Sequence, residues 1–429
     1  MNKIKISAIL VFLSLCTFFA CTENELYELA PNAEEANKSY AKQFKAIWVA
    51  LDLNYPIWDY ERDEYGLNWD DVYNRYLPLF AQLDSIYQAT GDAKNCELIA
   101  MVYYSNILQK LHDGHLYAKI KDVYTGTEYE ELSLLSSLDD PLVYMLKSSM
   151  CPITLNYYQS SNESGYTLLD SKQDDKEEYI YGLFNGDIVY LHFPNFQLSD
   201  IIENEMKTPA GQKVIDVWNA WYNKVQELNG NGSLKGVILD VRGNYGGYTD
   251  NYQYFLGALH GDIDGFGGIQ TGHYRMKIGT GRYDYGIVSD LSNDCYINPQ
   301  KHIDVKAPIV VLADSVSASM AEQTCLAAKR LPNACVVGTT TFGALSPSWS
   351  AKVEKTQFTD WGDIGDSTLV SSSFYIRMPF MAFVSWEGKI LERRGVTPDI
   401  FVDRDWNLCI RYGRDNQLER ALEYIKEGY

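Results

Sequence analysis

The stretch that decides the fold is GVILDVRGNYGG, at residues 236–247. Its first half is a short run of apolar, β-branched residues, which is typical of a strand buried on both faces of a sheet. Its second half is a polar, glycine-rich loop. Open α/β sheets bind ligands beyond the carboxyl ends of their strands, so this loop marks the expected edge of a functional site.

Three similar apolar runs lie on either side of this stretch: IVYLHF at 188–193, PIVVLA at 308–313 and ACVVG at 334–338. Helical patterns at 211–228 and 318–331 alternate with them. This alternation predicts an α/β core with a largely parallel sheet over residues 179–405. A short amphipathic helix is expected after it, within 406–429.

The part before the core has a different character. Apolar residues recur at helical spacing through residues 36–115, which predicts an N-terminal helical domain. Its last helix is expected to run into LHDGH at 111–115, with Gly114 as the C-cap because glycine adopts the left-handed conformation freely. Residues 116–178 mix β-like runs with polar loops and form an intervening region.

The first residues indicate export. Two early lysines precede an uncharged run at 6–20, which is too short for a membrane-spanning helix of about 20 residues. We therefore expect a signal peptide at 1–20, a lipid on Cys21 and a tether over 21–35. An exported lipoprotein of the cell envelope follows, at the outer membrane or cell surface or otherwise in the periplasm, with membrane contact through the lipid anchor only.

The formal net charge of −20 argues against nucleic acid or an anionic lipid surface as a partner. The sequence contains no C-x-x-C pair, no H-E-x-x-H motif and no glycine loop of the nucleotide-binding type. No metal or cofactor is therefore expected. Whether the cysteines that follow Cys21 form disulfides is left open.

Ser319 lies where a buried strand gives way to a helix, in ADSVSASMAEQ at 313–323. A serine at such a turn has its hydroxyl near free backbone N–H groups and the positive end of the helix dipole. This environment suits a nucleophile whose product carries an oxyanion. Composition alone does not separate it from a helix-capping serine.

Four motifs occur in order: GVILDVRGNYGG, PIVVLADSVSASMAEQ, VVGTTTFG and ERRGVTPDIFV. Together they resemble the catalytic core of the tail-specific (C-terminal-processing) and tricorn-type serine peptidases. The resemblance implies that Ser319 is the nucleophile and that the backbone N–H groups of Met320 and of either Gly246 or Gly247 bind the oxyanion. Many such peptidases carry a PDZ domain, but residues 116–178 are too few for one, and none is expected.

The general base departs from the tail-specific pattern. Those peptidases use a lysine 25 residues after the serine, and here that position holds Ala344 (344 − 319 = 25). The tricorn branch uses a histidine from an N-terminal segment that LHDGH resembles, which implies His115 as the base. The same resemblance implies Glu392 as the group that orients it. Asp113 is an alternative orienter, although an aspartate at such a place usually caps the backbone.

Three neighbours of these residues are expected to be structural. Asp240 and Arg242 should pair or brace the glycine-rich loop, and His192 should lie on a strand beneath the site.

These expectations describe a serine-type peptidase that hydrolyses peptides or unfolded protein segments through an acyl-enzyme. Because the lysine is missing, a catalytically inactive ligand-binding lipoprotein on the same fold is the alternative. A glycan-binding lipoprotein is a third possibility, suggested by the many aromatic residues. The oligomeric state is left open.

Overall fold

The computed structural model describes residues 33–129, 157–161, 165–173, 178–205, 208–261, 263, 268–279, 281–287, 302–347, 368–370, 374–379 and 381–427. The predicted signal peptide, the lipidation site Cys21 and most of the tether lie outside these residues. The chain forms two compact units. The first contains Met1–Ser136, Arg275–Ile287 and Pro347–Ala382, and the second contains Ser137–Tyr274, Val288–Ser346 and Phe383–Tyr429. The domain boundaries expected from the sequence stay predictions.

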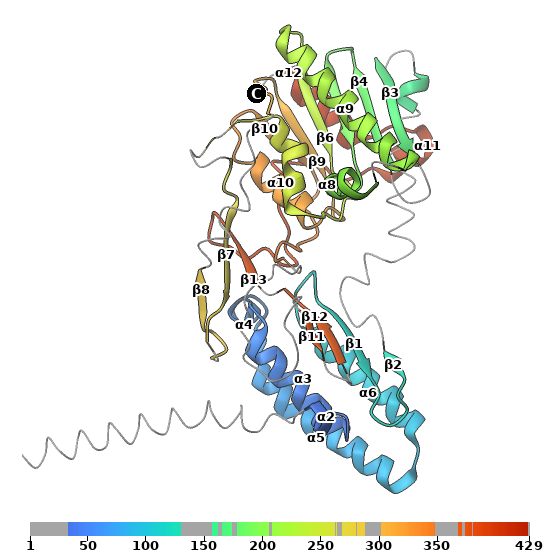
Figure 1. The fold of residues 1–429 in the computed structure, drawn as a ribbon, viewed down its shortest axis with the longest axis vertical. Helices are drawn as coiled ribbons and strands as arrows, with labels where there is room; N and C mark the ends of the chain where they lie inside the picture. The colour runs from blue at the N-terminus through green and yellow to red at the C-terminus, as the bar shows by residue number, and fades with distance from the viewer. Residues whose placement is uncertain are drawn as a thin grey trace, which may run out of the picture. The chain divides into compact units, whose positions relative to one another are not determined.

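The first unit consists of helices and short antiparallel strands (Figure 1). Its elements are α2 (Ala33–Ala36), α3 (Tyr40–Asn54), α4 (Trp58–Tyr65), α5 (Trp69–Thr90), α6 (Ala93–Leu108), β1 (Tyr117–Lys121), β2 (Glu128–Tyr129), β8 (Tyr285–Ile287), β11 (Thr368–Val370) and β12 (Phe374–Arg377). One sheet has the order β11-β12-β1-β2, with antiparallel pairs throughout. The expected N-terminal helices are confirmed.

Side-chain caps and aromatic packing explain why these helices form. Ser39, Asn68 and Asp92 accept hydrogen bonds from the first turns of α3, α5 and α6. Between the helices, Phe44 stacks on Phe80 with ring centroids 4.9 Å apart. Burying such rings removes a large apolar area from water, which holds the helices together.

The expected end of the last helix is wrong. α6 ends at Leu108, with Gln109 as its C-cap, so Gly114 does not cap it. Bends rather than helix follow over residues 111–115. Asp113 is fully buried, and its Oδ1 accepts a hydrogen bond from the His115 backbone N–H at 2.7 Å. The helix closes earlier, because Lys110 N and Leu111 N donate to Ile107 O and Leu108 O at 3.2 Å and 3.1 Å, and such i→i−3 bonds tighten and end the last turn.

The second unit is built on a seven-stranded sheet of order β14-β10-β9-β6-β5-β4-β3. Its strands are β3 (Tyr166–Gln173), β4 (Glu178–Phe184), β5 (Ile188–His192), β6 (Gly236–Asp240), β9 (Ile309–Ala313), β10 (Ala334–Gly338) and β14 (Ile400–Phe401). The strands from β14 to β5 are parallel, whereas β4 and β3 are antiparallel to their neighbours. The predicted fold class, α/β with a largely parallel sheet, is confirmed.

Helices and short turns of the second unit pack around this sheet (Figure 1). They are α8 (Leu198–Asp200), the π-helical turn η2 (Ile201–Glu205), α9 (Pro209–Gly230), the 3₁₀ turns η3 (Thr249–Tyr254) and η4 (Leu256–Ala258), α10 (Met320–Ala328), α11 (Trp406–Tyr412) and α12 (Asn416–Glu427). α9 contacts β3, β4 and β5, and α10 contacts β9 and β10. The expected C-terminal helix is confirmed as α12, whose Leu418 and Ile425 join a core cluster with Ile238 and Val310.

Two strands contain a boundary between the units: β7 (Gly272–Lys277) and β13 (Met381–Ser385). Within the first unit, the end of β7 pairs with β8 in antiparallel register. Arg275 binds Asp59 at 2.7 Å. These contacts attach the hairpin to the helices of the first unit.

The parallel sheet brings the sequence motifs together. β6, β9 and β10 lie side by side and point the same way, so their carboxyl ends share one edge. The residues that follow these ends are the glycine-rich loop, the turn of Ser319 and the TTTFGA segment at 339–344. The sheet topology therefore assembles one site from three distant parts of the chain.

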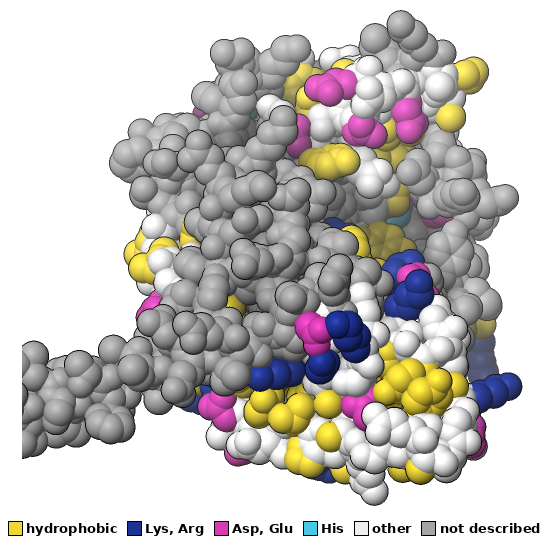
Figure 2. Space-filling model, turned by 60° about the horizontal axis from the view of Figure 1, so that its bottom comes forward, with side chains coloured by type: hydrophobic (Ala, Val, Ile, Leu, Met, Phe, Trp, Pro, Cys, Tyr) yellow, Lys and Arg dark blue, Asp and Glu magenta, His cyan; other side chains and the backbone are white. Residues whose placement is uncertain are grey.

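Four of the six cysteines that follow Cys21 lie in the described part of the chain. Cys96, Cys325, Cys335 and Cys409 are buried free thiols, while Cys151 and Cys295 lie outside the described residues. In the described part of the chain, no helix combines the length and apolar character that crossing a membrane requires. On the face that Figure 2 shows, Lys and Arg side chains lie among Asp, Glu and hydrophobic side chains, so the described residues there do not form a patch of one charge.

Candidate active site

Ser319 is the residue directly before α10, at the turn between β9 and this helix. Its backbone has φ 56° and ψ −116°, a conformation that side chains with a Cβ rarely adopt. The turn is held by the Ala318 N–H, which donates to Asn244 O at 2.9 Å, and by the Phe342 N–H, which donates to Ser317 O at 2.9 Å. Such strain persists only where the surrounding structure imposes it.

This strain gives a stability prediction. Ser319→Gly should have a free energy of unfolding about 1 kcal/mol higher than Ser319→Ala, because glycine adopts a positive φ without a Cβ clash. Both variants lack the hydroxyl, so chemical denaturation of the pair isolates the backbone effect. Equal stabilities would show that the turn is not strained.

The glycine loop, which we define as residues 241–248, packs directly on this turn. A Cβ added to Gly246 would lie 2.6 Å from both Met320 N and Ser319 Cβ. The Gly246 N–H donates to Asn244 Oδ1 at 2.8 Å, whereas its carbonyl accepts from Phe196 N at 2.8 Å. Gly247 has φ 147° and forms a bridge with Phe196. The Gly246 N–H is therefore already engaged by a side chain.

Glu322 ties the serine turn to the TTTFGA segment. It is fully buried, and its carboxylate accepts four hydrogen bonds. Their donors are Ser319 N at 3.0 Å, Thr341 Oγ1 at 2.5 Å, Gly343 N at 2.7 Å and Ala344 N at 2.7 Å. Burial raises the pKa of Glu322 to about 7, although these bonds act in the opposite direction. Ala344 thus takes part through its backbone alone.

Glu392 binds the continuation of the same segment. It is fully buried, and its Oε1 accepts from Leu345 N at 2.9 Å and from Ser346 N at 2.6 Å. Glu322 and Glu392 therefore hold consecutive parts of one segment, and Glu392 lies near the serine turn in the second unit. Its predicted role toward His115 stays a prediction.

The histidines of LHDGH belong to the first unit. His112 is held by the buried Glu61, which accepts from its backbone N at 2.6 Å and lies 2.8 Å from its Nδ1. The His112 ring also stacks on Tyr65, with centroids 3.4 Å apart. These contacts give His112 a structural role. His115 is partly buried, and its pairing with Ser319 stays a prediction.

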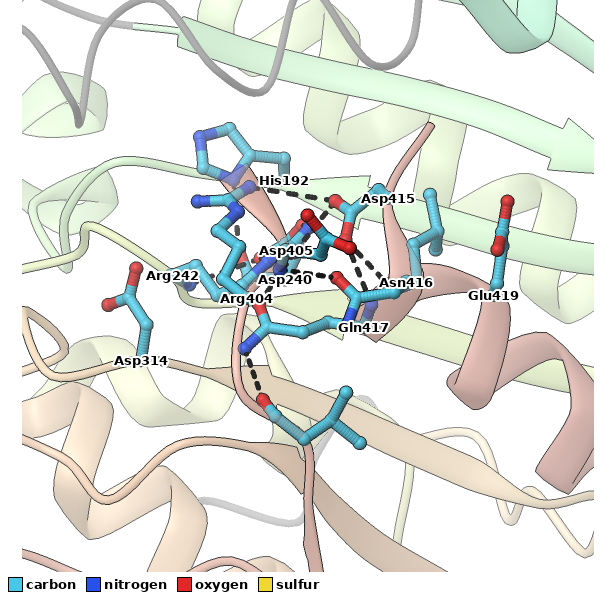
Figure 3. A network of polar contacts seen from close by, with 12 residues as sticks. His192, Asp240, Arg242, Asp314, Arg404, Asp405, Asp415, Asn416, Gln417 and Glu419 are labelled. Carbon is cyan, nitrogen blue, oxygen red and sulfur yellow. Dashed lines mark hydrogen bonds and ion pairs between the residues drawn. The ribbon is translucent and has the colours of Figure 1, made fainter. Parts of the chain in front are cut away.

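A buried ion-pair network lies beside the glycine loop (Figure 3). Arg242 binds both oxygens of Asp240, at 2.9 Å and 2.5 Å, so the expected pairing of these residues is confirmed. Burial raises the pKa of the Asp240 carboxyl, but the positive charge of Arg242 outweighs this and lowers it to about 2. His192 is buried on β5 with Nδ1 3.1 Å from Asp240 O, and burial lowers its pKa, as a structural histidine requires.

Comparison with known proteins identifies the group to which the site belongs. The model of peptidase family S41 matches residues 187–402, which is half of the chain. The chain belongs to peptidase family S41. This is the family of tail-specific serine peptidases, as the four motifs imply, and its members act on proteins or peptides. None of the curated proteins matches the chain.

Two solved structures show the S41 fold over nearly the whole chain. A protein from Parabacteroides merdae ATCC 43184 assigned as a peptidase is 20% identical, with a TM-score of 0.58 and coverage of 90% of this chain and 96% of that one. Mature CPAF is 12% identical, with a TM-score of 0.52 and coverage of 91% and 97%. At these identities the likeness extends to the fold alone.

Several residues of this S41 site were not predicted from the sequence. Asn244 holds both the glycine loop and the serine turn, and Asp314 Oδ1 accepts from Gly243 N at 3.1 Å. Both residues lie inside the recognised motifs, and this position could have indicated that they belong to the site. Asp415, which binds Arg242, lies outside every motif. Among the described residues, no group of three or more potential metal ligands occurs.

Proposed function

We propose that this S41 member is an active serine peptidase in which Ser319 forms the acyl-enzyme and His115 is the general base. The observation that carries the proposal is the turn of Ser319: a strained serine at the N-terminus of α10, packed against the glycine loop. Strain of this kind is expected at functional sites, where surrounding contacts sustain it. A serine retained only for helix capping does not require it.

The proposed reaction proceeds in two steps. The Ser319 hydroxyl attacks the peptide carbonyl carbon while His115 takes its proton, and His115 then gives that proton to the leaving amine. His115 next takes a proton from a water molecule, which attacks the ester carbonyl carbon. The bond to Ser319 Oγ then breaks, the acid leaves, and His115 returns the proton to Ser319. Glu392 is proposed to orient the imidazole and to stabilise its protonated form.

The oxyanion is proposed to bind the backbone N–H groups of Met320 and Gly247. Met320 is the first residue of α10, where the helix dipole favours negative charge. Gly247 is preferred over Gly246 because the Gly246 N–H donates to Asn244. Two such donors, preset in position, stabilise the transition state more than the substrate.

The proposed substrates are peptides or unfolded protein segments, and the proposed site of action is the cell envelope. There the chain would be anchored only through a lipid on Cys21, after removal of residues 1–20. The short uncharged run before Cys21 supports this placement.

A fluorophosphonate probe tests the proposal. The purified chain should be labelled at Ser319, identified by mass spectrometry of the adduct, and Ser319→Ala should abolish labelling. Ser315→Ala is the matched control, because this exposed serine lies four residues earlier on the same turn and should label like the wild type.

The alternative is a ligand-binding protein that has lost catalysis, and the alanine at position 344 favours it. Failure of the wild type to label between pH 6 and pH 9, while it remains folded, would reject the peptidase in favour of this alternative.

A further inference from the structure

The network beside the glycine loop extends to the start of α12 (Figure 3). Arg242 Nη1 binds Asp415 Oδ2 at 2.7 Å and Gln417 Oε1 at 3.1 Å. Asp415 and Gln417 are fully buried, and Arg242 is 5% exposed. The guanidinium therefore joins β6 to a helix that begins far along the chain.

The geometry uses most of the hydrogen-bonding capacity of Arg242. Nε and Nη2 bind the two oxygens of Asp240, while Nη1 binds the two residues of the α12 start. A guanidinium is a rigid planar fork, so these bonds fix its position and its plane. Asp415 is itself held, because its Oδ1 accepts from Gln417 N at 3.1 Å and from Leu418 N at 3.2 Å.

The backbone of Arg242 leads directly into the glycine loop. Asn244, two residues later, bonds Gly246 through its side chain and Ala318 through its carbonyl. The Asn244 amide nitrogen also donates to Phe193 O at 3.0 Å. A short series of bonds thus connects Asp415 through Arg242 and Asn244 to the residue before Ser319.

This connection depends on the charge of Asp415. Arg242 is buried between two carboxylates, those of Asp240 and Asp415, and a buried charge that loses a partner is strongly disfavoured. Arg404 lies 3.6 Å from Asp415 and depends on the same carboxylate. Removing the charge of Asp415 therefore leaves both guanidinium groups undercompensated, and Arg242 responds at the point where the glycine loop begins.

We propose that Asp415 and Gln417 are positioning residues for the glycine loop and that they act through Arg242. They hold the loop where its Gly247 N–H meets the oxyanion on Ser319, although they touch no reacting atom. This inference rests on the proposed function of Ser319 where it is tested by labelling kinetics. Its second test, hydrogen exchange of the loop amides, does not depend on that function.

Asp415→Asn is the informative variant, because asparagine has the same shape and its oxygen still accepts from the first turn of α12. The labelling rate at saturating fluorophosphonate should fall at least tenfold, since small displacements of catalytic groups cost up to about 100-fold. The half-saturating probe concentration should stay unchanged. Arg242→Lys should show the same loss, because an ammonium group cannot reproduce the fork.

Glu423→Gln is the matched control on the same helix. Glu423 forms a surface pair with Arg420 at 3.8 Å, and its own side chain is 61% exposed. This variant should label at the wild-type rate. Rates are compared per folded molecule, with the folded fraction taken from thermal unfolding, so that a loss of stability alone does not count as a positioning effect.

Hydrogen exchange over residues 241–248 provides the second test. The loop amides should exchange faster in Asp415→Asn than in Glu423→Gln. If Asp415→Asn does not fold, Gln417→Leu takes its place in both measurements. It deletes the weaker of the two contacts to Arg242, together with the hydrogen bond from Gln417 Nε2 to Val402 O.

The outcomes separate the two proposals. The positioning role is overturned if Asp415→Asn labels and exchanges like the Glu423→Gln control. It is also overturned if the unfolded fraction explains the whole loss of labelling. If the wild type does not label at all, the peptidase proposal fails. The exchange comparison then decides the positioning role alone: faster loop exchange supports it, and equal exchange overturns it.

Discussion

Replacing His115 by alanine should lower the rate of Ser319 acylation by about 10² to 10⁴-fold, the usual contribution of a general base. Ala344 has no titratable atom at the position where tail-specific peptidases carry their lysine, so no lysine there can take over. Rapid-mixing measurements of fluorophosphonate labelling give the rate. The folded state should be retained, because His115 is only partly buried.

His302→Ala is the control for this prediction. His302 is an exposed histidine in the other unit, and its replacement should leave the labelling rate unchanged. Labelling of His115→Ala at the wild-type rate would show that another group deprotonates Ser319. Glu392→Gln should give a smaller loss than His115→Ala, because an orienting group acts through the base.

Replacing Gly246 by alanine should reduce the labelling rate by about 10² to 10³-fold, because displacement of the loop would remove the proposed Gly247 donor, and losing one oxyanion donor costs this much. The new methyl group would lie 2.6 Å from Met320 N, closer than any relaxed contact allows, and the φ of 92° disfavours a Cβ in any case. The loop must therefore move away from the serine turn. Activity is lost even though the Gly246 N–H itself is bound to Asn244.

Gly230→Ala is the matched control, since a Cβ at this last residue of α9 has no atom within 4 Å. It should match the wild type in labelling and in thermal stability. A normal labelling rate for Gly246→Ala, with the protein folded, would mean that the loop does not contribute to the oxyanion site.

The strands and the shared edge of the sheet could be predicted because buried parallel strands have a strong local signature. The apolar, β-branched run GVILDV is typical of a buried parallel strand, and the loop that follows it must lie at the carboxyl end of that strand. Pairing of Asp240 with Arg242 was predictable for the same reason, since the two residues flank the strand end.

The end of the helix before His115 was not predictable from the pattern of apolar residues. The helix closes with i→i−3 backbone bonds from Lys110 and Leu111, and beyond it the Asp113 carboxylate binds the His115 backbone. None of these bonds alters the pattern of apolar residues. Asp415 was missed for another reason. Its partner Arg242 lies 173 residues earlier, and no local pattern reports a contact at that separation.

The contacts of Glu392 and Asp415 also determine when the proposed active site can form during synthesis of the chain. Ser319 and the glycine loop are made earlier than the two carboxylates that hold their surroundings, so a chain still emerging from the ribosome lacks both carboxylates. Contacts between distant segments form late in folding, because closing a long loop costs entropy before the contact repays it. An unfinished chain that lacks Glu392 and Asp415 is therefore expected to lack a fixed serine turn and glycine loop, and so to be inactive as the proposed peptidase.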